Sequence, residues 1–248
     1  MKIRLTVTIL VLLTGLAVWF YRQFLRPSSL PSKPRTIEQV LTALAPSVEH
    51  RLRPAFERTD LGWPPRNLTL LAFKAERRLE LYASDAEEKP RFVRSYPILA
   101  TSGSSGPKLR EGDKQVPEGF YRIELLNPNS RYHLSLRVNY PNADDVERAR
   151  QDGRDLSTLG GDIMIHGGAQ SVGCLAVGNA AAEDLFVLAA DSDWQRAVIV
   201  VSPVDFRRTD LPADYRPPAD WVNRLYSWLR RELRALPLPP THLTTRRL

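Results

Sequence analysis

The chain has 248 residues, of which 43% are hydrophobic and 25% are charged. These proportions exclude a disordered chain and allow one sizeable core with a small appendage. The formal net charge of +7 lies at the two ends. Residues 1–35 contain six basic residues and no acidic one, and residues 222–248 contain six arginines against Glu232, so that residues 36–221 are mildly acidic. A nucleic-acid partner is not expected, because it would require a basic folded face.

The pattern of residues 1–26 predicts an N-terminal signal-anchor, a segment that targets the chain to the membrane and stays there. Two basic residues precede an apolar run from residue 5 to residue 21, and two arginines follow it. The run is close to the lower length limit of a membrane span, and it ends in bulky aromatic residues where a signal peptidase requires small ones. We therefore expect an uncleaved membrane anchor, with a cleaved export signal as the alternative.

Residues 27–35 are rich in proline and serine, which is typical of a linker. A helical preface is then expected over residues 36–66. Thr36, with a glutamine three residues later, matches the capping box that begins a helix. The helix is expected to end before Pro46, with a second helical segment over residues 48–56.

Residues 67–206 show the alternating and continuous apolar patterns of strands. The expected strands are NLTLLAF and RRLELYA, paired as a hairpin, then RFVRSYPILA, FYRIELL, YHLSLRV, GDIMIHG and AVIVVSPV. A turn is expected at residues 127–130, and helices at residues 144–151 and over AAAEDLFVLAAD. This pattern predicts a mainly β fold with peripheral helices, an α+β domain resembling a β-sandwich. The polar stretch at 101–119 is expected to be a loop that is too long to be an idle turn, and GSSG at 103–106 within it is expected to be a flexible link.

Residues 207–248 predict a C-terminal helix followed by a loose tail. The helix carries one apolar stripe, formed by Trp221, Leu225, Trp228, Leu229 and Leu236. Such a stripe usually packs against a core, which is the favoured interpretation. The alternative is a helix that lies on a membrane surface.

Cys174 is the only cysteine, and it follows His166 by eight positions. A lone thiol in an exported protein forms no internal disulfide, which favours a chemical use over a merely buried apolar residue. His166 is expected at the end of a strand, and Cys174 lies across a loop of seven residues from it. Gly173 allows the turn that exposes the sulfur and helps aim backbone amides at a developing oxyanion. The pattern predicts cysteine acyl transfer, with a thiol whose pKa is depressed.

Other chemistries have little support in the sequence. The four histidines are scattered with no pair at metal-ligand spacing, and no Gly-x-Ser-x-Gly motif of a serine hydrolase occurs. We expect neither a metal nor a cofactor.

The segment IMIHGGAQSVGCLAV resembles the signature of the L,D-transpeptidase catalytic-domain family of the YkuD type, in which His-Gly is followed by Ser-x-Gly-Cys. SSGPKLREGDKQVPEGFYRI, NPNSRYHLSLRVNYPN and VIVVSPVDF are similar to its YafK-like subgroup. The resemblance covers residues 68–206. It implies an L,D-transpeptidase catalytic domain over residues 67–206 that acts on peptidoglycan stem peptides at diaminopimelate-linked bonds. It also implies a protein that faces the periplasm from the inner membrane, or that is free in the periplasm if the signal is cleaved.

Carried onto this sequence, the resemblance implies a role for each residue of the motif. Cys174 would be the nucleophile and His166 the general base, oriented by the backbone carbonyl of Gly167. Ser171 would brace the loop, and the amides of Gly173 and Cys174 would form the oxyanion hole.

The motif also departs from the family pattern. Val172 and Ala176 stand where the family usually has polar residues that hold the stem peptide. Water could therefore replace an amine as the acyl acceptor, which leaves hydrolysis of the same class of cross-link, including links between an envelope protein and peptidoglycan, as an alternative. An inactive peptidoglycan-binding module is a second alternative. Lys108, Lys114 and Arg110 are either carboxylate-binding residues or solvated loop charges.

Overall fold

The computed structural model describes residues 33–85 and 89–240. The chain divides into two compact units, Met1–Pro34 and Arg35–Leu248, and every described helix and strand belongs to the second. The predicted anchor, most of the predicted linker and the predicted tail lie outside the described residues. Within the described ranges, no helix has both the length and the apolar character needed to cross a membrane.

The described chain forms one eight-stranded sheet with helices around it. The strands are β1 (Asn67–Phe73), β2 (Arg78–Ser84), β3 (Arg91–Pro97), β4 (Gly119–Ser130), β5 (His133–Val138), β6 (Met164–His166), β7 (Leu175–Ala176) and β8 (Val198–Ser202). The helices are α2 (Ile37–Thr59), α3 (Ala143–Gln151), α4 (Asn179–Asp191) and α5 (Asp220–Arg234), with short 3-10 turns at Leu156–Thr158 and Trp194–Arg196.

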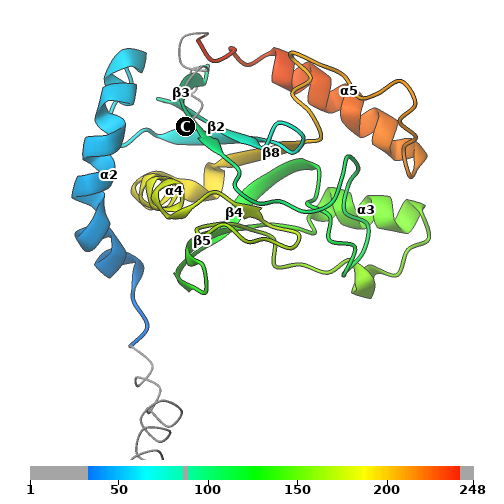
Figure 1. The fold of residues 1–248 in the computed structure, drawn as a ribbon, viewed down its shortest axis with the longest axis horizontal. Helices are drawn as coiled ribbons and strands as arrows, with labels where there is room; N and C mark the ends of the chain where they lie inside the picture. Colours follow the sequence, from blue (N-terminus) through cyan, green and yellow to red (C-terminus); the bar gives the residue numbers. More distant parts are fainter. Residues whose placement is uncertain (1–32, 86–88, 241–248) are drawn as a thin grey trace, which may run out of the picture. The chain divides into compact units, whose positions relative to one another are not determined.

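The long strand β4 joins two halves of the sheet. The strand order is β3-β2-β1-β8-β4-β5-β6-β7. Residues 119–122 of β4 pair with β8, and later residues of the same strand pair with β5. β2 and β8 lie above β4 and β5 in Figure 1. The predicted class, mainly β with peripheral helices, is confirmed, and its two layers are the two halves of one continuous sheet.

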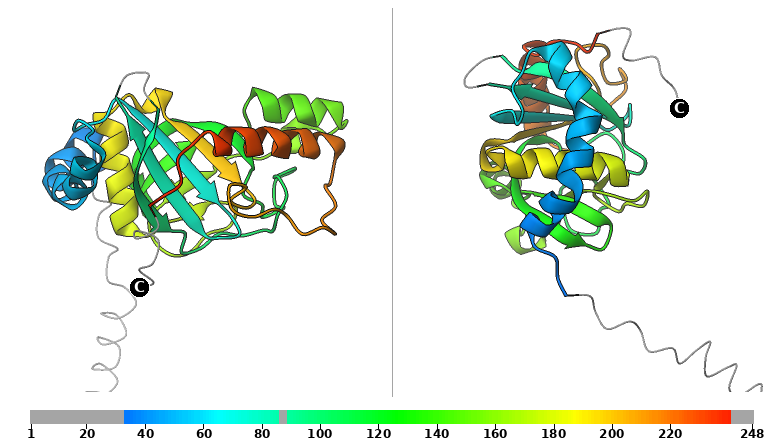
Figure 2. Two further views of the ribbon diagram at one scale, coloured as in Figure 1. Left: turned by 90° about the horizontal axis from the view of Figure 1, so that it is seen from above. Right: turned by 90° about the vertical axis from the view of Figure 1, so that its left-hand side faces the viewer.

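The main core lies between these halves and is completed by α4, whose Leu185 and Phe186 are buried in it. α2 crosses outside α4, as the right-hand view of Figure 2 shows. Arg51 of α2 holds the two helices together, since its Nη2 lies 2.8 Å from Oδ1 of the buried Asp184 and 3.1 Å from Oε2 of Glu183.

The second core covers the opposite face of β1 and β8, where Leu71 and Val200 meet Leu225 and Leu229 of α5. The left-hand view of Figure 2 shows α5 running along this face. The predicted stripe of the C-terminal helix therefore packs on the domain.

Two local predictions were wrong. α2 is one continuous helix through Pro46 and Pro54, and it begins with the predicted capping box at Thr36. Both prolines are exposed, so the buried Leu52 face keeps its packing although each proline removes a helical hydrogen bond.

The turn expected at 127–130 belongs to β4, and the chain reverses at residues 131–132. Asn129 explains the longer strand, because its side chain accepts a hydrogen bond from the amide of Arg35 and donates one to the carbonyl of Arg35. The polar residues that signalled a turn are thus satisfied in extended backbone.

A buried ion network joins β2 to the segment that follows β8. The guanidinium of Arg207 lies 2.7 Å from Glu80 Oε2 and 2.7 Å from Asp205 Oδ1, and both carboxylates are fully buried. Arg78 contacts the same two carboxylates. Removing a cation from such a network leaves buried negative charge without compensation.

Arg207→Ala should therefore lower the free energy of unfolding by about 3–5 kcal/mol, as measured by urea denaturation. Arg208→Ala is the matched control, because the Arg208 side chain is 42% exposed and its contact with Asp205 is longer, at 3.6 Å. This substitution should lower the free energy of unfolding by less than about 1 kcal/mol. Equal losses for the two variants would contradict the stabilising role of the buried network.

Candidate active site

Two short parallel strands bring the predicted nucleophile and base to one face of the sheet. Ile165 of β6 pairs with Leu175 of β7, and His166 pairs with Ala176. Ile165 and Leu175 point into the main core. Because side chains alternate along a strand, the side chains of His166 and Cys174 both lie on the opposite face. They come from neighbouring segments of the sheet, and Cys174 lies two residues before Ala176, the pairing partner of His166.

The thiol of Cys174 is held in its neutral form. Its Sγ accepts a hydrogen bond from the amide of Met164 at 3.4 Å and donates one to the carbonyl of Asp162 at 3.5 Å. Burial raises the pKa of the thiol, and the hydrogen bond from the Met164 amide offsets only part of this rise. The charge of Asp162 raises the pKa further, and that of Lys108 lowers it. The expected depressed pKa was therefore wrong for the structure at rest.

The imidazole of His166 is buried and oriented by its neighbour. Nδ1 lies 2.6 Å from the carbonyl oxygen of Gly167. A carbonyl only accepts hydrogen bonds, so Nδ1 carries the proton and Nε2 keeps its lone pair. Burial lowers the pKa of His166, and the bond to Gly167 partly offsets this. The ring is thus a neutral base, and the carbonyl of Gly167 stands where the predicted orienting role requires it.

Gly167 leaves no room for a side chain. A Cβ there would lie 2.5 Å from the carbonyl oxygen of Tyr132 and 2.7 Å from Oδ1 of Asn179. This close approach also lets the Tyr132 ring stack on the imidazole of His166, with ring centroids 4.7 Å apart. Sequence reasoning missed Tyr132 because it placed the turn before this residue, and the misplaced turn hid the contact.

Ser171 braces the nucleophile from both sides. Its hydroxyl donates to the carbonyl of Cys174 at 2.6 Å and accepts from the amide of Cys174 at 3.0 Å. The amide of Gly173 donates to Oγ of Ser102 at 2.7 Å, and that hydroxyl donates onward to the carbonyl of Lys114.

The two amides expected to form an oxyanion hole are therefore not open in this structure. Each already donates to a serine hydroxyl, so an oxyanion at the site has to replace that hydroxyl as the acceptor. Such replacement is favourable, because hydrogen bonds to an anion are roughly twice as strong as those between neutral groups. Ser102 was not among the predicted site residues, and no motif in the polar stretch marked it.

The long polar loop between β3 and β4 is held in place at Gly106, the last residue of the GSSG segment that was expected to be flexible. The buried Lys74 reaches Oε1 of Glu118 at 2.8 Å and the carbonyl of Gly106 at 2.9 Å. The amide of Gly106 donates to the same carboxylate, whose other oxygen accepts from the hydroxyl of Tyr226 on α5 at 2.7 Å. The loop is thus fixed to Lys74, which directly follows β1, and to Tyr226 of α5.

The three basic residues of the loop, Lys108, Arg110 and Lys114, differ in whether their charge is free to bind a substrate carboxylate. Nζ of Lys108 is 2.8 Å from Asp113 Oδ1 and donates to the carbonyl of Arg110, so its charge is internally compensated. Arg110 and Lys114 are located in the exposed part of the loop.

The sequence of this chain matches a known protein family. The sequence pattern of the L,D-transpeptidase catalytic domain, YkuD, matches residues 69–204. YafK of Escherichia coli K12, which is classed by name with the L,D-transpeptidases, is 37% identical over 141 residues, covering 56% of this chain and 54% of YafK. The chain thus matches about half the length of this curated relative.

Two solved structures illustrate the wider likeness. The helical cell shape determining protein Pgp2 of Campylobacter jejuni superposes with a TM-score of 0.44 at 23% identity, over 55% of this chain and 48% of Pgp2. L,D-transpeptidase 1 of Mycobacterium tuberculosis superposes with a TM-score of 0.31 at 14% identity, over 55% of this chain and 62% of that one. The match to the family pattern covers more than half of the chain and includes both His166 and Cys174. The chain therefore belongs to the L,D-transpeptidase catalytic-domain family of the YkuD type.

Proposed function

We propose that this protein is a cysteine enzyme that transfers acyl groups of peptidoglycan stem peptides at bonds next to diaminopimelate. The observation that carries the proposal is the thiol of Cys174 on the same face as an imidazole whose tautomer is fixed by Gly167. A base, a group that orients the base and a nucleophile are the parts that acyl transfer requires. Membership of the family supports peptidoglycan as the substrate class.

In the first half-reaction, Sγ of Cys174 attacks the carbonyl carbon of the stem peptide and its proton passes to Nε2 of His166. The new S–C bond places negative charge on the former carbonyl oxygen, which the amides of Gly173 and Cys174 can stabilise in place of their serine acceptors. The intermediate collapses as the C–N bond breaks and His166 returns the proton to the leaving amine. A thioester on Cys174 remains.

In the second half-reaction, an acceptor attacks the thioester. An amine of another stem gives a new cross-link, whereas water gives a carboxylate. In both cases His166 removes a proton from the acceptor and the thiol is restored. The difference between a transpeptidase and a hydrolase therefore lies in what reaches the thioester.

One observation favours hydrolysis as a second candidate. Ala176, at a position where the family usually has a polar residue, is fully buried and forms a β-bridge with Ala100. Val172, the other departure, is 72% exposed and offers no hydrogen bond. Both positions therefore lack the polar side chains with which the family usually holds the stem peptide. An envelope protein linked to peptidoglycan is then a candidate substrate.

The surface around the thiol suits a peptide ligand. Tyr132 and Val172 are among the large apolar side chains exposed in the described part of the chain. Tyr132 stacks on the base, and Val172 precedes the nucleophile by two residues. Exposed apolar groups that gather beside polar reactive groups are typical of binding surfaces. We propose that the protein faces the periplasm, with residues 1–26 as a membrane anchor.

Reaction products test this proposal directly. The full-length protein should convert diaminopimelate-containing tetrapeptide muropeptides to dimers or exchanged products, or cleave a diaminopimelate-linked dimer with addition of one water, as detected by mass spectrometry. Cys174→Ala should abolish either reaction. His166→Ala should lower the rate by about 10²–10⁴-fold because the general base is lost.

His50→Ala is the matched control, since His50 is an exposed histidine of α2, and its rate should equal that of the wild type. Absence of any product with the wild-type protein would argue for a peptidoglycan-binding module without turnover.

The pH dependence of alkylation tests the state of the thiol. Because burial raises the pKa of Cys174, the thiolate forms late. The rate of iodoacetamide modification should keep rising above about pH 8.5, the ordinary pKa of a free cysteine, and at pH 7 it should be slower than that of glutathione. A rate that levels off near neutrality would indicate a preformed thiolate instead.

The acid limb of the activity profile tests the base. His166 must be neutral to accept the proton, and burial lowers its pKa. Activity should therefore persist below about pH 6.5, the ordinary pKa of histidine, and fall only at more acidic pH. A kcat/KM profile that already declines above this pH would contradict a buried, neutral base.

A further inference from the structure

An arginine that the catalytic pair does not use lies on the same face of the sheet. Arg137 of β5 pairs with Met164 of β6, and Ser135 pairs with His166. Leu134, Leu136 and Val138 of β5 point into the main core, so Arg137 points to the face that carries the thiol. The backbone amide of Met164, the pairing partner of Arg137, donates a hydrogen bond to Sγ of Cys174. Arg137 and the thiol therefore lie on either side of the same residue of β6.

The spacing suits a substrate that bridges the two residues. Neighbouring strands lie about 4.8 Å apart, so Cα of Arg137 and the chain at Cys174, separated by β6, are roughly 10 Å apart. The two carboxyl carbons of an extended diaminopimelate are roughly 7 Å apart. A carbonyl held at Sγ therefore leaves the free carboxylate within the reach of the arginine side chain.

The guanidinium of Arg137 retains unused hydrogen-bonding capacity. Its Nη2 lies 3.3 Å from Asp162 Oδ1, and Glu124 Oε2 lies 3.0 Å from Nε but outside hydrogen-bond geometry. The Nε–H is consequently buried without an acceptor among the described residues. The side chain itself is 37% exposed, while Asp162 and Glu124 are 81% and 51% exposed. Ion pairs with such exposed carboxylates are weak and easily exchanged.

We infer that Arg137 is the subsite for the free side-chain carboxylate of diaminopimelate in the acyl donor. The inference rests on the proposed function, because it takes the ligand from peptidoglycan. A carboxylate that approaches Arg137 gives the Nε–H an acceptor and forms the two-pronged pair for which arginine is suited. Lys108, by comparison, is committed to Asp113. Arg137 thus sets the donor specificity of the site and takes no part in the chemical step.

The test compares two ligands and two variants of the full-length protein. The ligands are a tetrapeptide muropeptide with the free diaminopimelate carboxylate and the same peptide with that carboxylate amidated. Binding is measured by calorimetry in the Cys174→Ala background, with and without Arg137→Gln, and turnover is measured in the wild-type background.

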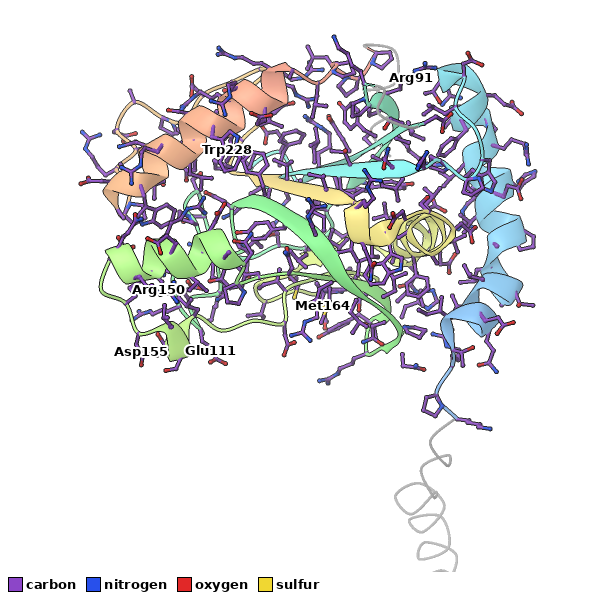
Figure 3. All side chains as sticks on the ribbon, turned by 180° about the vertical axis from the view of Figure 1, so that it is seen from behind. Arg91, Glu111, Arg150, Asp155, Met164 and Trp228 are labelled. Atoms are coloured by element: carbon purple, nitrogen blue, oxygen red, sulfur yellow. The ribbon has the colours of Figure 1, made fainter. Side chains whose placement is uncertain are left out.

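Arg150→Gln serves as the control for loss of an arginine, because Arg150 of α3 is 61% exposed and also pairs with a carboxylate. Figure 3 shows Arg150 on α3, well apart from Met164, the pairing partner of Arg137. Arg137→Lys is a second variant that keeps the charge and removes the two-pronged geometry.

The free-carboxylate peptide should bind about 10- to 100-fold more tightly than the amidated one, and Arg137→Gln should remove this preference while leaving the affinity for the amidated peptide within about threefold. Arg137→Lys should recover part of the preference, and Arg150→Gln should keep all of it. An undiminished preference in Arg137→Gln would overturn the subsite. Discrimination in binding without turnover would overturn only the proposed function, and absence of binding to either peptide would overturn both.

Discussion

The parallel pairing of β6 and β7 is the constraint on which the site depends. These strands have only three and two residues, and their register decides which face each side chain takes. A slip of one residue would turn Cys174 into the core and Leu175 outward, with loss of both the chemistry and the packing. The register is secured by the buried Ile165 and Leu175 on one side. It is also secured by the tight approach at Gly167, where no side chain fits.

The site at rest satisfies its own hydrogen bonds. The thiol has a backbone donor and a backbone acceptor, and the amides of Gly173 and Cys174 both donate to serine hydroxyls. Buried polar groups are normally paired in this way. An acceptor that reaches these amides therefore has to replace a serine hydroxyl, which favours an anionic oxygen over a neutral one.

Much of this arrangement could be predicted from the sequence. Alternating and continuous apolar runs marked the strands, and the single cysteine eight positions after a histidine marked the reactive pair. The family signature led to the carbonyl of Gly167. What failed depended on contacts between distant segments. The turn before Tyr132 was misplaced because Asn129 is satisfied by Arg35, which is far away in sequence. The GSSG segment seemed flexible because the residues that hold its loop in place, Lys74 and Tyr226, are far away in sequence. The thiol pKa was misjudged because burial by the folded chain cannot be read from adjacent residues.

Glu118 links the loop beside the nucleophile to α5, a helix that lies beyond the residues matched by the family pattern. The pattern ends at residue 204, yet the buried carboxylate of Glu118 receives hydrogen bonds from Lys74, Gly106 and Tyr226 of α5. A fragment cut at the family boundary would lose Tyr226 and expose the face of Leu71 and Val200. The compact unit that contains the site therefore includes α5. The packing of α5 on the sheet thus makes this helix part of the domain that contains the site, although the family pattern ends before it.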